Sequence, residues 1–263
     1  MGALTGFRIL DLSRILAGPW CSQILADLGA EVIKIEKPDH GDDTRIWGPP
    51  WLKNNSNEDT HESAYYLSAN RGKHSVAVDI STPAGQTLIH KLVLESDVVI
   101  ENYKAGSLKR YSLDYETLST LNPKIVYCSI TGFGQNGPRA AEPGYDFIVQ
   151  GMGGMMSVTG ERDDLPGGGP QKAGLAFADL TTGLYSAIAI QAALLSREMV
   201  IKMPHTLRED YTSIGSPIKL SKTPVEYKKA PPCLGEDTDT VLSQFISQDE
   251  IAQLKAQGVI QQR

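Results

Sequence analysis

The segment FRILDLSRILAGPWCSQILADLGAEVIKIE (residues 7–36) decides how this chain folds. FRILDLS (7–13) predicts a β-strand, AGPWCSQILADLGA (17–30) a helix that closes at Gly29, and EVIKIE (31–36) a second strand. Both strands are apolar with little alternation, which is typical of strands that helices cover on both faces. The segment therefore predicts a β-α-β unit.

The same alternation continues to about residue 135. SVAVDI (75–80), DVVIENY (97–103) and KIVYCSITG (124–132) predict further strands. Thr82 and Pro83 mark the start of a helix between the first two of these, with proline at the first helical position. We predict an α/β fold with a doubly wound, mostly parallel, Rossmann-like sheet.

Two polar or irregular regions interrupt this pattern. KNNSNEDTHES (53–63) predicts a surface loop. After about residue 197 the alternation stops, and repeated prolines divide the chain into extended pieces before a last amphipathic helix, SQDEIAQLKAQ (247–257). We expect an α/β domain over residues 1–197 and a separate C-terminal segment over residues 198–263.

Composition excludes several classes of protein. The 263 residues carry 25 Lys and Arg against 31 Asp and Glu, a net charge of −6 with no basic block, which argues against nucleic acid or an anionic membrane as partner. No apolar stretch is long enough to span a membrane, and the beginning does not resemble a signal peptide. The 3 cysteines lie far apart, which indicates reduced thiols and neither disulfides nor a metal site. We expect a cytoplasmic protein, with the mitochondrial matrix as the alternative compartment.

Dinucleotide binding is the first hypothesis that such a sheet suggests, but the phosphate loop is missing. The first strand is followed by SRILAGPW, which has one glycine, Gly18, in place of G-x-G-x-x-G. Glu36 does end the second strand, where a ribose-binding acid would lie. Without the glycines we do not expect NAD to bind.

Asp179 is the most unusual acid of the chain, because it lies between apolar and small residues in KAGLAFADLTTGLYSAIA. One interpretation makes it a helix N-cap that accepts from the amides of Thr181 and Thr182. The other makes it a carboxylate nucleophile, desolvated and close to donors that hold the resulting anions. The two interpretations are compatible, since a helix N-terminus both orients a carboxylate and supplies amides.

Several motifs in one order carry a family resemblance. They are FRILDLSRILAGPWCSQILADLGAEVIKIEKPDHGDDTRIWGPP, SANRGKHSVAVDI, VVIENYKAGSLKRYSLDYETLSTLNP, IVYCSITGFGQNGPRAAEPGYDFIVQGMGGMMSVTG and ADLTTGLYSAIA. Together, from residue 5 to about 197, they resemble the class III CoA-transferases, the family of formyl-CoA transferase and L-carnitine CoA-transferase. GDDTR-x-WGPP looks most similar to the succinyl-CoA:glutarate CoA-transferase branch.

The resemblance implies coenzyme A or acyl-CoA as substrate, with no permanently bound cofactor and a small carboxylic acid as second substrate. It implies that Asp179 is the nucleophile, which forms a mixed anhydride and then an aspartyl-CoA thioester. By matching motifs, the CoA contacts should be Ile15, Leu16, Ala17, Lys37, Asn70, Lys73, Asn102, Tyr103 and Arg110. The family includes 2-methylacyl-CoA racemases, which carry a histidine where this chain has Tyr145, so Tyr145 favours transfer.

The chain departs from the family after LLSREMV (194–200). There the family has a small domain, but this sequence continues directly into IKMPHTLREDYTSIGSPIKLSKTP, which is similar to the segment that returns to the large domain. We therefore expect the small domain to be absent. The resemblance implies a homodimer. For this chain, a simpler dimer or a monomer are the alternatives. Racemase activity, or CoA binding without turnover, remain the alternative functions.

Overall fold

The computed structural model describes residues 2–196, 200–205, 208–214, 237–257 and 259–260. The chain divides into two compact units, residues 1–194 and 195–263. The first unit is built on a five-stranded sheet in the order β5-β2-β1-β6-β7, in which every neighbouring pair is parallel. Its strands are β1 (Arg8–Asp11), β2 (Glu31–Glu36), β5 (Lys73–Ala77), β6 (Val98–Glu101) and β7 (Val126–Ser129).

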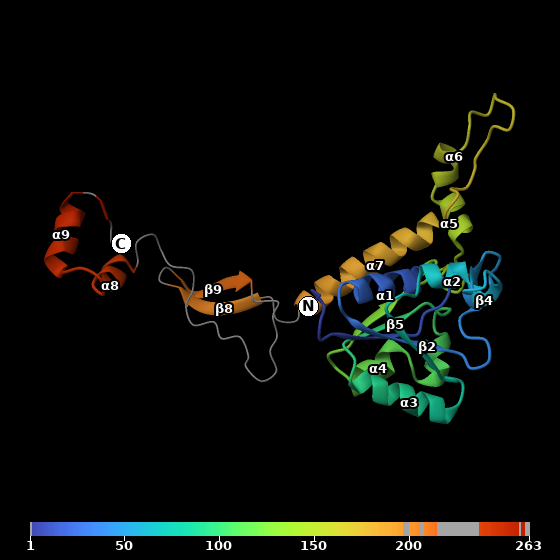
Figure 1. The fold of residues 1–263 in the computed structure, drawn as a ribbon, viewed down its shortest axis with the longest axis horizontal. Helices are drawn as coiled ribbons and strands as arrows, with labels where there is room; N and C mark the ends of the chain where they lie inside the picture. The colour runs from blue at the N-terminus through green and yellow to red at the C-terminus, as the bar shows by residue number, and fades with distance from the viewer. Residues whose placement is uncertain (1, 197–199, 206–207, 215–236, 258, 261–263) are drawn as a thin grey trace. The chain divides into compact units, whose positions relative to one another are not determined.

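Helices cover both faces of this sheet, as Figure 1 shows. One face packs against α1 (Ala17–Asp27) and α7 (Phe177–Ser196), and the other against α3 (Pro83–Leu94) and α4 (Tyr115–Leu121). Consecutive strand residues alternate between two buried clusters, so that Ile9 packs towards α1 and α7 while Leu10 packs towards α3 and α4. The doubly wound, mostly parallel Rossmann-like sheet predicted from the sequence is confirmed.

Local sequence signals explain where α3 begins and where α1 ends. The Thr82 hydroxyl accepts from the amide of Gly85 at 3.1 Å, and Pro83 is the first residue of α3, as predicted. Gly29 has φ +102 just beyond α1, a left-handed conformation that favours glycine. The predicted second strand matches β2 residue for residue.

Shorter elements connect these layers. They are η1 (Asp43–Ile46), β3 (Trp51–Lys53), β4 (Asp59–Ser63), α2 (Ala64–Ser68), η2 (Ser107–Tyr111), α5 (Asp146–Met152) and α6 (Met155–Thr159). The prediction of a loop over residues 53–63 is wrong, because β3 and β4 pair as an antiparallel hairpin. The Asn54 side chain accepts from the amides of Ser56 and Glu58, each at 2.9 Å, which closes the turn within a polar sequence.

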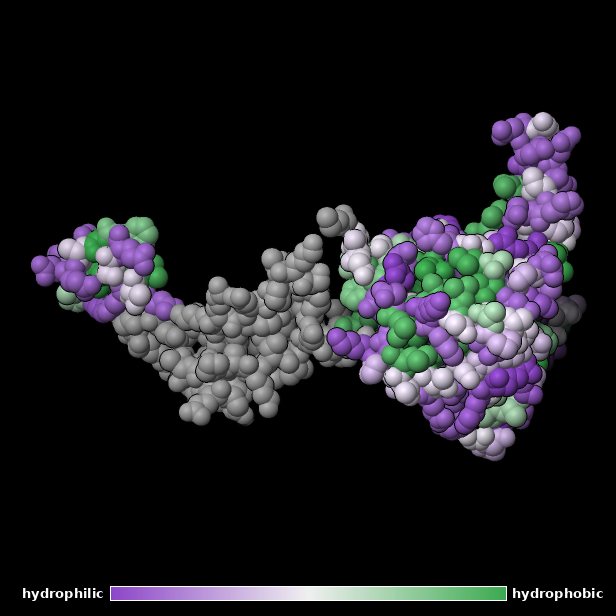
Figure 2. Space-filling view, turned by 90° about the horizontal axis from the view of Figure 1, so that it is seen from below, coloured by the Kyte–Doolittle hydropathy of each residue, from purple (hydrophilic) through white to green (hydrophobic). Residues whose placement is uncertain are grey.

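The surface of the first unit is not uniformly polar. Figure 2 shows apolar side chains gathered on the visible face of this unit, with polar ones around them. Large apolar side chains are also exposed on α5 and α7, among them Phe147, Tyr185 and Ile188. Such residues are available for contact with other parts of an assembly.

The second unit contains β8 (Val200–His205) and β9 (Arg208–Ile214), which pair as an antiparallel hairpin, followed by α8 (Thr238–Leu242) and α9 (Gln248–Ala256). The Ser247 hydroxyl caps α9 by accepting from the amide of Glu250 at 3.3 Å, as the sequence predicted. Extended pieces were expected between residues 198 and 246, of which residues 215–236 lie outside the described part of the chain. That residues 198–263 return to the α/β domain stays a prediction.

Candidate functional site

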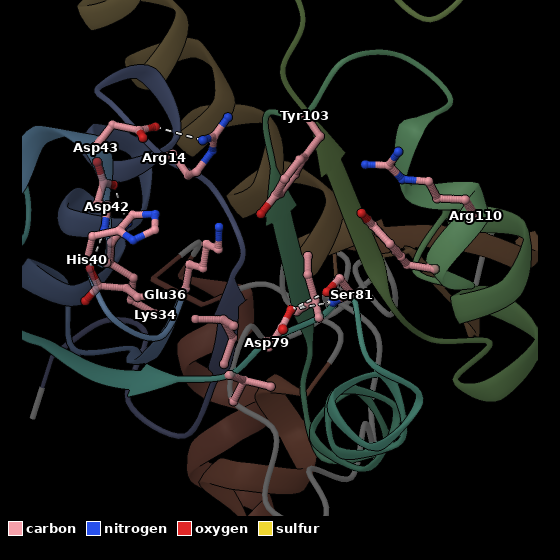
Figure 3. Close-up of a pocket in the computed structure, with 16 residues that line it drawn as sticks. Arg14, Lys34, Glu36, His40, Asp42, Asp43, Asp79, Ser81, Tyr103 and Arg110 are labelled. Atoms are coloured by element: carbon pink, nitrogen blue, oxygen red, sulfur yellow. Dashed lines mark hydrogen bonds and ion pairs between the residues drawn. The ribbon is translucent and has the colours of Figure 1, made fainter.

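A pocket of about 240 Å³ opens beyond the carboxyl ends of the parallel strands. Open α/β sheets bind their ligands at this edge, because the loops that follow neighbouring strands diverge there. Figure 3 shows Arg14, Tyr103 and Arg110 around the pocket from one side and Asp79 and Ser81 from the other. The lining residues are Arg14, Lys34, Ile35, Glu36, Lys37, His40, Gly41, Asp42, Asp43, Val78, Asp79, Ile80, Ser81, Tyr103, Arg110 and Tyr111.

Three of the residues predicted to contact CoA line this pocket, namely Lys37, Tyr103 and Arg110. Arg14 joins them without having been predicted. Its guanidinium pairs with Asp43 at 2.7 Å and lies 5.3 Å from the centre of the Tyr103 ring. Arginine and lysine side chains on one wall suit a phosphate-bearing ligand, because both neutralise phosphate charge.

Three more predicted residues, Ile15, Leu16 and Ala17, form the loop that leads from β1 into α1. Leu16 and Ala17 are buried. Ile15 has φ +70, which is left-handed backbone that a β-branched residue rarely adopts. The predicted Asn102 fastens this loop: it accepts from the amide of Arg14 at 2.8 Å and donates to the Arg14 carbonyl at 2.6 Å.

A buried ion pair lies beneath the same loop. The Lys34 ammonium and the Asp42 carboxylate are 2.9 Å apart, and their side chains are 1% and 0% exposed. Lys34 also donates to the carbonyl of Ser13 at 2.9 Å. Asp42 accepts from the amide of Ile15 at 3.2 Å, so the pair ties β2 to the loop that follows β1.

Glu36, at the end of β2, is held entirely by groups of the protein. Arg45 donates to both of its oxygens at 2.8 and 2.7 Å, and Ser75 and the amide of Asp42 donate as well. Burial alone would raise the pKa of Glu36, but these donors outweigh burial and lower the pKa to about 2. This acid therefore has donors of its own and does not need a ribose hydroxyl.

The predicted contacts Asn70 and Lys73 lie beneath α1. The Lys73 ammonium is 2% exposed; it donates to the Pro19 carbonyl at 2.9 Å and to Asn70 at 2.8 Å, and it pairs with the buried Asp11 at 3.3 Å. Burial lowers the pKa of Lys73 to about 8, although Asp11 opposes the shift. Neither residue lines the pocket, so their contact with CoA stays a prediction.

Asp179 lies in the first turn of α7 beside a second carboxylate. The Asp179 amide donates to Asp146 of α5 at 3.1 Å. Burial, and after it the charge of Asp146, raises the pKa of Asp179 to about 6. The pKa of Tyr65 in α2 is raised as well, first by burial and then by the charges of Asp179 and Asp146.

The interpretation of Asp179 as an N-cap is wrong, because α7 begins at Phe177, two residues earlier. The hydroxyl of Thr181 donates to the carbonyl of Phe177 at 2.7 Å, as within a regular helix. Within the described part of the chain, no group donates a hydrogen bond to the Asp179 carboxylate, which leaves it open to react. The segment before the helix is fixed by the buried Gln150, which accepts from the amide of Ala173 at 2.9 Å and also donates to Asp146.

Helix α7 passes close to the beginning of α1. A β-carbon at Gly183 would lie 2.8 Å from the carbonyl oxygen of Ala17, so only glycine allows this approach. Because Gly183 follows Asp179 by about one helical turn, the contact holds Asp179 near the end of the 15–17 loop. The fold thus joins two groups of predicted residues that lie far apart in the sequence.

Tyr145 and Gly154 lie on either side of α5. Tyr145 precedes α5 and is 61% exposed. Gly154 has φ +78 between α5 and α6, so this glycine serves a turn. Among residues 2–196 and the other described ranges, no cluster of His, Cys, Asp or Glu could hold a metal ion, and no helix is long and apolar enough to cross a bilayer.

Sequence reasoning missed Arg14, Lys34, Asp42 and Asp146 as members of the site. Lys34 had a visible signal, since a lysine inside the apolar run EVIKIE must find a buried partner. The signal for Asp146 was weaker: it follows Tyr145, which the sequence had already drawn attention to. Asp42 belongs to the GDDTR-x-WGPP motif, but that motif did not reveal its role, which depends on the loop that it contacts.

Comparisons with known proteins find similar sequences over most of the first unit. The model of a family described as CoA-transferase family III matches residues 4–199. The chain is 57% identical over 192 residues to succinate–glutarate CoA-transferase of Agrobacterium fabrum, covering 73% of this chain and 47% of that protein. It is 48% identical over 197 residues to succinyl-CoA:glutarate CoA-transferase of Mus musculus, covering 75% and 43%.

A solved structure is also similar. The crystal structure of a CAIB/BAIF family protein from Brucella suis matches with a TM-score of 0.68 and 55% identity, covering 74% of this chain and 49% of that one. The chain thus spans about half the length of the curated relatives it matches.

Proposed function

Because this chain belongs to CoA-transferase family III, we propose that it carries the CoA-binding, nucleophile-bearing part of an enzyme that moves CoA from an acyl-CoA to a carboxylic acid. We propose succinyl-CoA as donor and a dicarboxylic acid as acceptor. The names of the relatives, which include succinate–glutarate and succinyl-CoA:mesaconate CoA-transferases, support this choice of substrates.

The observation that carries the proposal is the state of Asp179. Its carboxylate is half-buried, has a pKa raised to about 6, receives no hydrogen bond from the described residues, and lies at the start of a helix. Desolvation makes a carboxylate a better nucleophile, while a pKa near 6 leaves it ionised at neutral pH.

In the proposed reaction the Asp179 carboxylate attacks the thioester carbonyl of the donor. The carbon–sulfur bond breaks, CoA leaves as the thiolate with the electron pair, and a mixed anhydride remains on Asp179. The thiolate then attacks the aspartyl carbonyl, which gives an aspartyl-CoA thioester and releases the donor acid. The acceptor acid takes the acyl position by the reverse of these steps, so no net redox change or proton source is required.

The proposed CoA contacts divide according to the geometry. Lys37 and Arg110 would neutralise phosphate groups in the pocket, and Tyr103 would offer an apolar wall. Ile15, Leu16 and Ala17 would run between this pocket and Asp179, with Asn102 holding their loop. Asn70 and Lys73 would act from beneath α1. We further propose a reducing compartment, cytoplasm or mitochondrial matrix, which the free thiols of Cys21 and Cys128 suit.

We also propose that the protein works as a homodimer. Tyr185 and Ile188 are 74% and 60% exposed on α7, and Phe147 is 55% exposed on α5. Apolar side chains so exposed suit a contact with a second copy. Sedimentation equilibrium measures this directly, and a monomer at all concentrations would contradict it.

Intact mass spectrometry tests the reaction. The chain is mixed with succinyl-CoA and then treated with hydroxylamine, which converts an anhydride or thioester to a hydroxamate, or with borohydride, which reduces the thioester to an alcohol. We expect the modification on the peptide that contains Asp179. A folded chain that binds CoA without forming the adduct would favour CoA binding without turnover, the second candidate, which the coverage of only half of the relatives' length makes reasonable. Solvent deuterium at the α-carbon of a 2-methylacyl-CoA would instead indicate racemisation.

A further inference from the structure

We propose that Asp42 is a positioning residue for CoA: together with Lys34 it holds Ile15 in a left-handed conformation and thereby fixes the loop that contains Arg14. The proposal rests on the proposed function, because the ligand it concerns is CoA. It goes beyond that function by assigning a role to two buried residues that do not belong to the predicted CoA contacts.

The conformation of Ile15 is the first observation. Its φ of +70 lies in the region where the β-carbon crowds the following carbonyl, at a cost of about 1–2 kcal/mol for a residue other than glycine. The other non-glycine residues of the described chain with positive φ are Asp39, Asn57 and Ser112, which are small or polar. A β-branched residue keeps such a conformation only where its surroundings enforce it, and such positions gather at ligand sites.

The bonds that enforce it come from three segments, namely β2, the residue after β6 and the N-cap of η1, and they reach three consecutive residues. Lys34 donates to the Ser13 carbonyl, Asn102 grips the amide and carbonyl of Arg14, and the Ile15 amide donates to both Asp42 oxygens at 3.3 and 3.2 Å. Four main-chain groups of residues 13–15 therefore have a side-chain partner.

The Asp42 carboxylate is itself fixed. Besides Lys34 and the Ile15 amide, it accepts from the amide and hydroxyl of Thr44 at 3.0 and 2.8 Å. All of its neighbours are donors, so an asparagine amide at this position would oppose at least one N–H with another. Buried ion pairs add little stability compared with apolar residues of the same size, so this pair is better explained by the conformation it specifies.

The consequence for binding is preorganisation. A loop that had to become left-handed only when CoA arrives would subtract that ordering cost from the affinity. With Asp42 in place, the loop already has its left-handed conformation in the folded, free protein. CoA binding then does not include this ordering cost, and Arg14 already lies at the pocket. Glycine at position 15 would reach the same conformation without help, and this difference provides a test.

The experiment is a mutant cycle in the full chain, with CoA affinity measured by calorimetry and the thermal midpoint measured in parallel. Asp42→Asn should weaken CoA binding by about tenfold, the equivalent of the left-handed penalty. Because Ile15 is itself a proposed CoA contact, Ile15→Gly alone supplies the reference affinity for the cycle. In the Ile15→Gly background, Asp42→Asn should weaken CoA binding by less than about threefold, so that most of the loss it causes in the starting chain disappears. If Asp42→Asn does not fold, Asp42→Glu, which keeps the charge but displaces the carboxylate, takes its place.

Asn57→Gly is the matched control, since Asn57 is also left-handed but lies in the β3–β4 turn, away from the pocket. It should not restore CoA affinity in the Asp42→Asn background. If both glycine variants raise the thermal midpoint and neither recovers affinity, Asp42 is merely structural and the proposal is overturned; unchanged affinity in Asp42→Asn also overturns it. Failure of the unsubstituted chain to bind CoA would instead contradict the proposed function, and coupling of the thermal midpoints of positions 15 and 42 would then still reveal the clamp.

Discussion

The carboxylates beneath the pocket and the carboxylate at the start of α7 lie in opposite surroundings. Asp42 and Glu36 are nearly inaccessible, and every oxygen of theirs accepts from a cation, hydroxyl or amide. Asp179 is partly exposed, has no donor among the described residues, and faces a second acid, Asp146. The donors around Glu36 lower its pKa and those around both acids fix the geometry, whereas burial and Asp146 raise the pKa of Asp179 and leave its carboxylate without a donor among the described residues. One unit of the chain thus places a carboxylate in a rigid, fully paired setting at one point and, at another, in a setting that suits the nucleophile we propose.

The strongest test of this contrast removes the reactive carboxylate. We expect Asp179→Ala to lower the rate of CoA exchange between succinate and a labelled acid by about 10³-fold or more, because it removes the group that we propose forms the covalent intermediate. CoA affinity should stay unchanged, since the pocket lies at the strand ends. Exposed Asp163, replaced by alanine, is the control and should leave exchange intact. Exchange retained in Asp179→Ala would remove it as the nucleophile.

The second test concerns the rigid region. The pKa of Glu36 is lowered to about 2, so its ionised form stabilises the fold above about pH 4.5, and this contribution is lost as the pH falls towards 2. Because the side chain is well shielded but lies next to the pocket, we expect about 2 kcal/mol. Urea unfolding at several pH values should show that Glu36→Gln is less stable than the unsubstituted chain near pH 7 and that the gap closes near pH 2. A gap that does not depend on pH would show that Glu36 acts by shape alone.

The third test alters the electrostatics of Asp179 without touching it. Asp146→Asn keeps an oxygen that can accept from the Asp179 amide but removes the like charge that helps raise the pKa of Asp179. The rate of adduct formation with succinyl-CoA should rise with pH through about 6 in the unsubstituted chain, because the nucleophile must be ionised. In Asp146→Asn the midpoint should move down by about one pH unit. An unmoved midpoint would mean that burial alone sets the pKa.

The same contrast explains which parts of the molecule the sequence could predict. The strands and the helices α1 and α3 followed from periodicity and caps, because local residues decide them. The hairpin at residues 53–63 was missed because its strands are polar, and the bonds of Asn54 that close it have no periodic signal. The start of α7 was misjudged by three residues, since Gln150 and Asp146, distant in sequence, fix the segment where α7 begins.

The smallest predicted effect is the change in the free energy of unfolding when the charge of Asp179 is removed. A carboxyl whose folded pKa is raised to about 6 makes the folded chain less stable once the pH exceeds its unfolded value near 3.8, and the penalty is complete above about pH 6. Asp179→Asn removes that charge and keeps the size, so it should raise the free energy of unfolding at pH 7.5 by about 1 kcal/mol, a reduced figure because the side chain is partly exposed. The gain should vanish near pH 3.5, where both forms are neutral. Asp42→Asn should do the reverse at pH 7.5, because it removes a charge that is paired; if both variants changed stability in the same direction, the two regions would not differ in the way the contacts indicate.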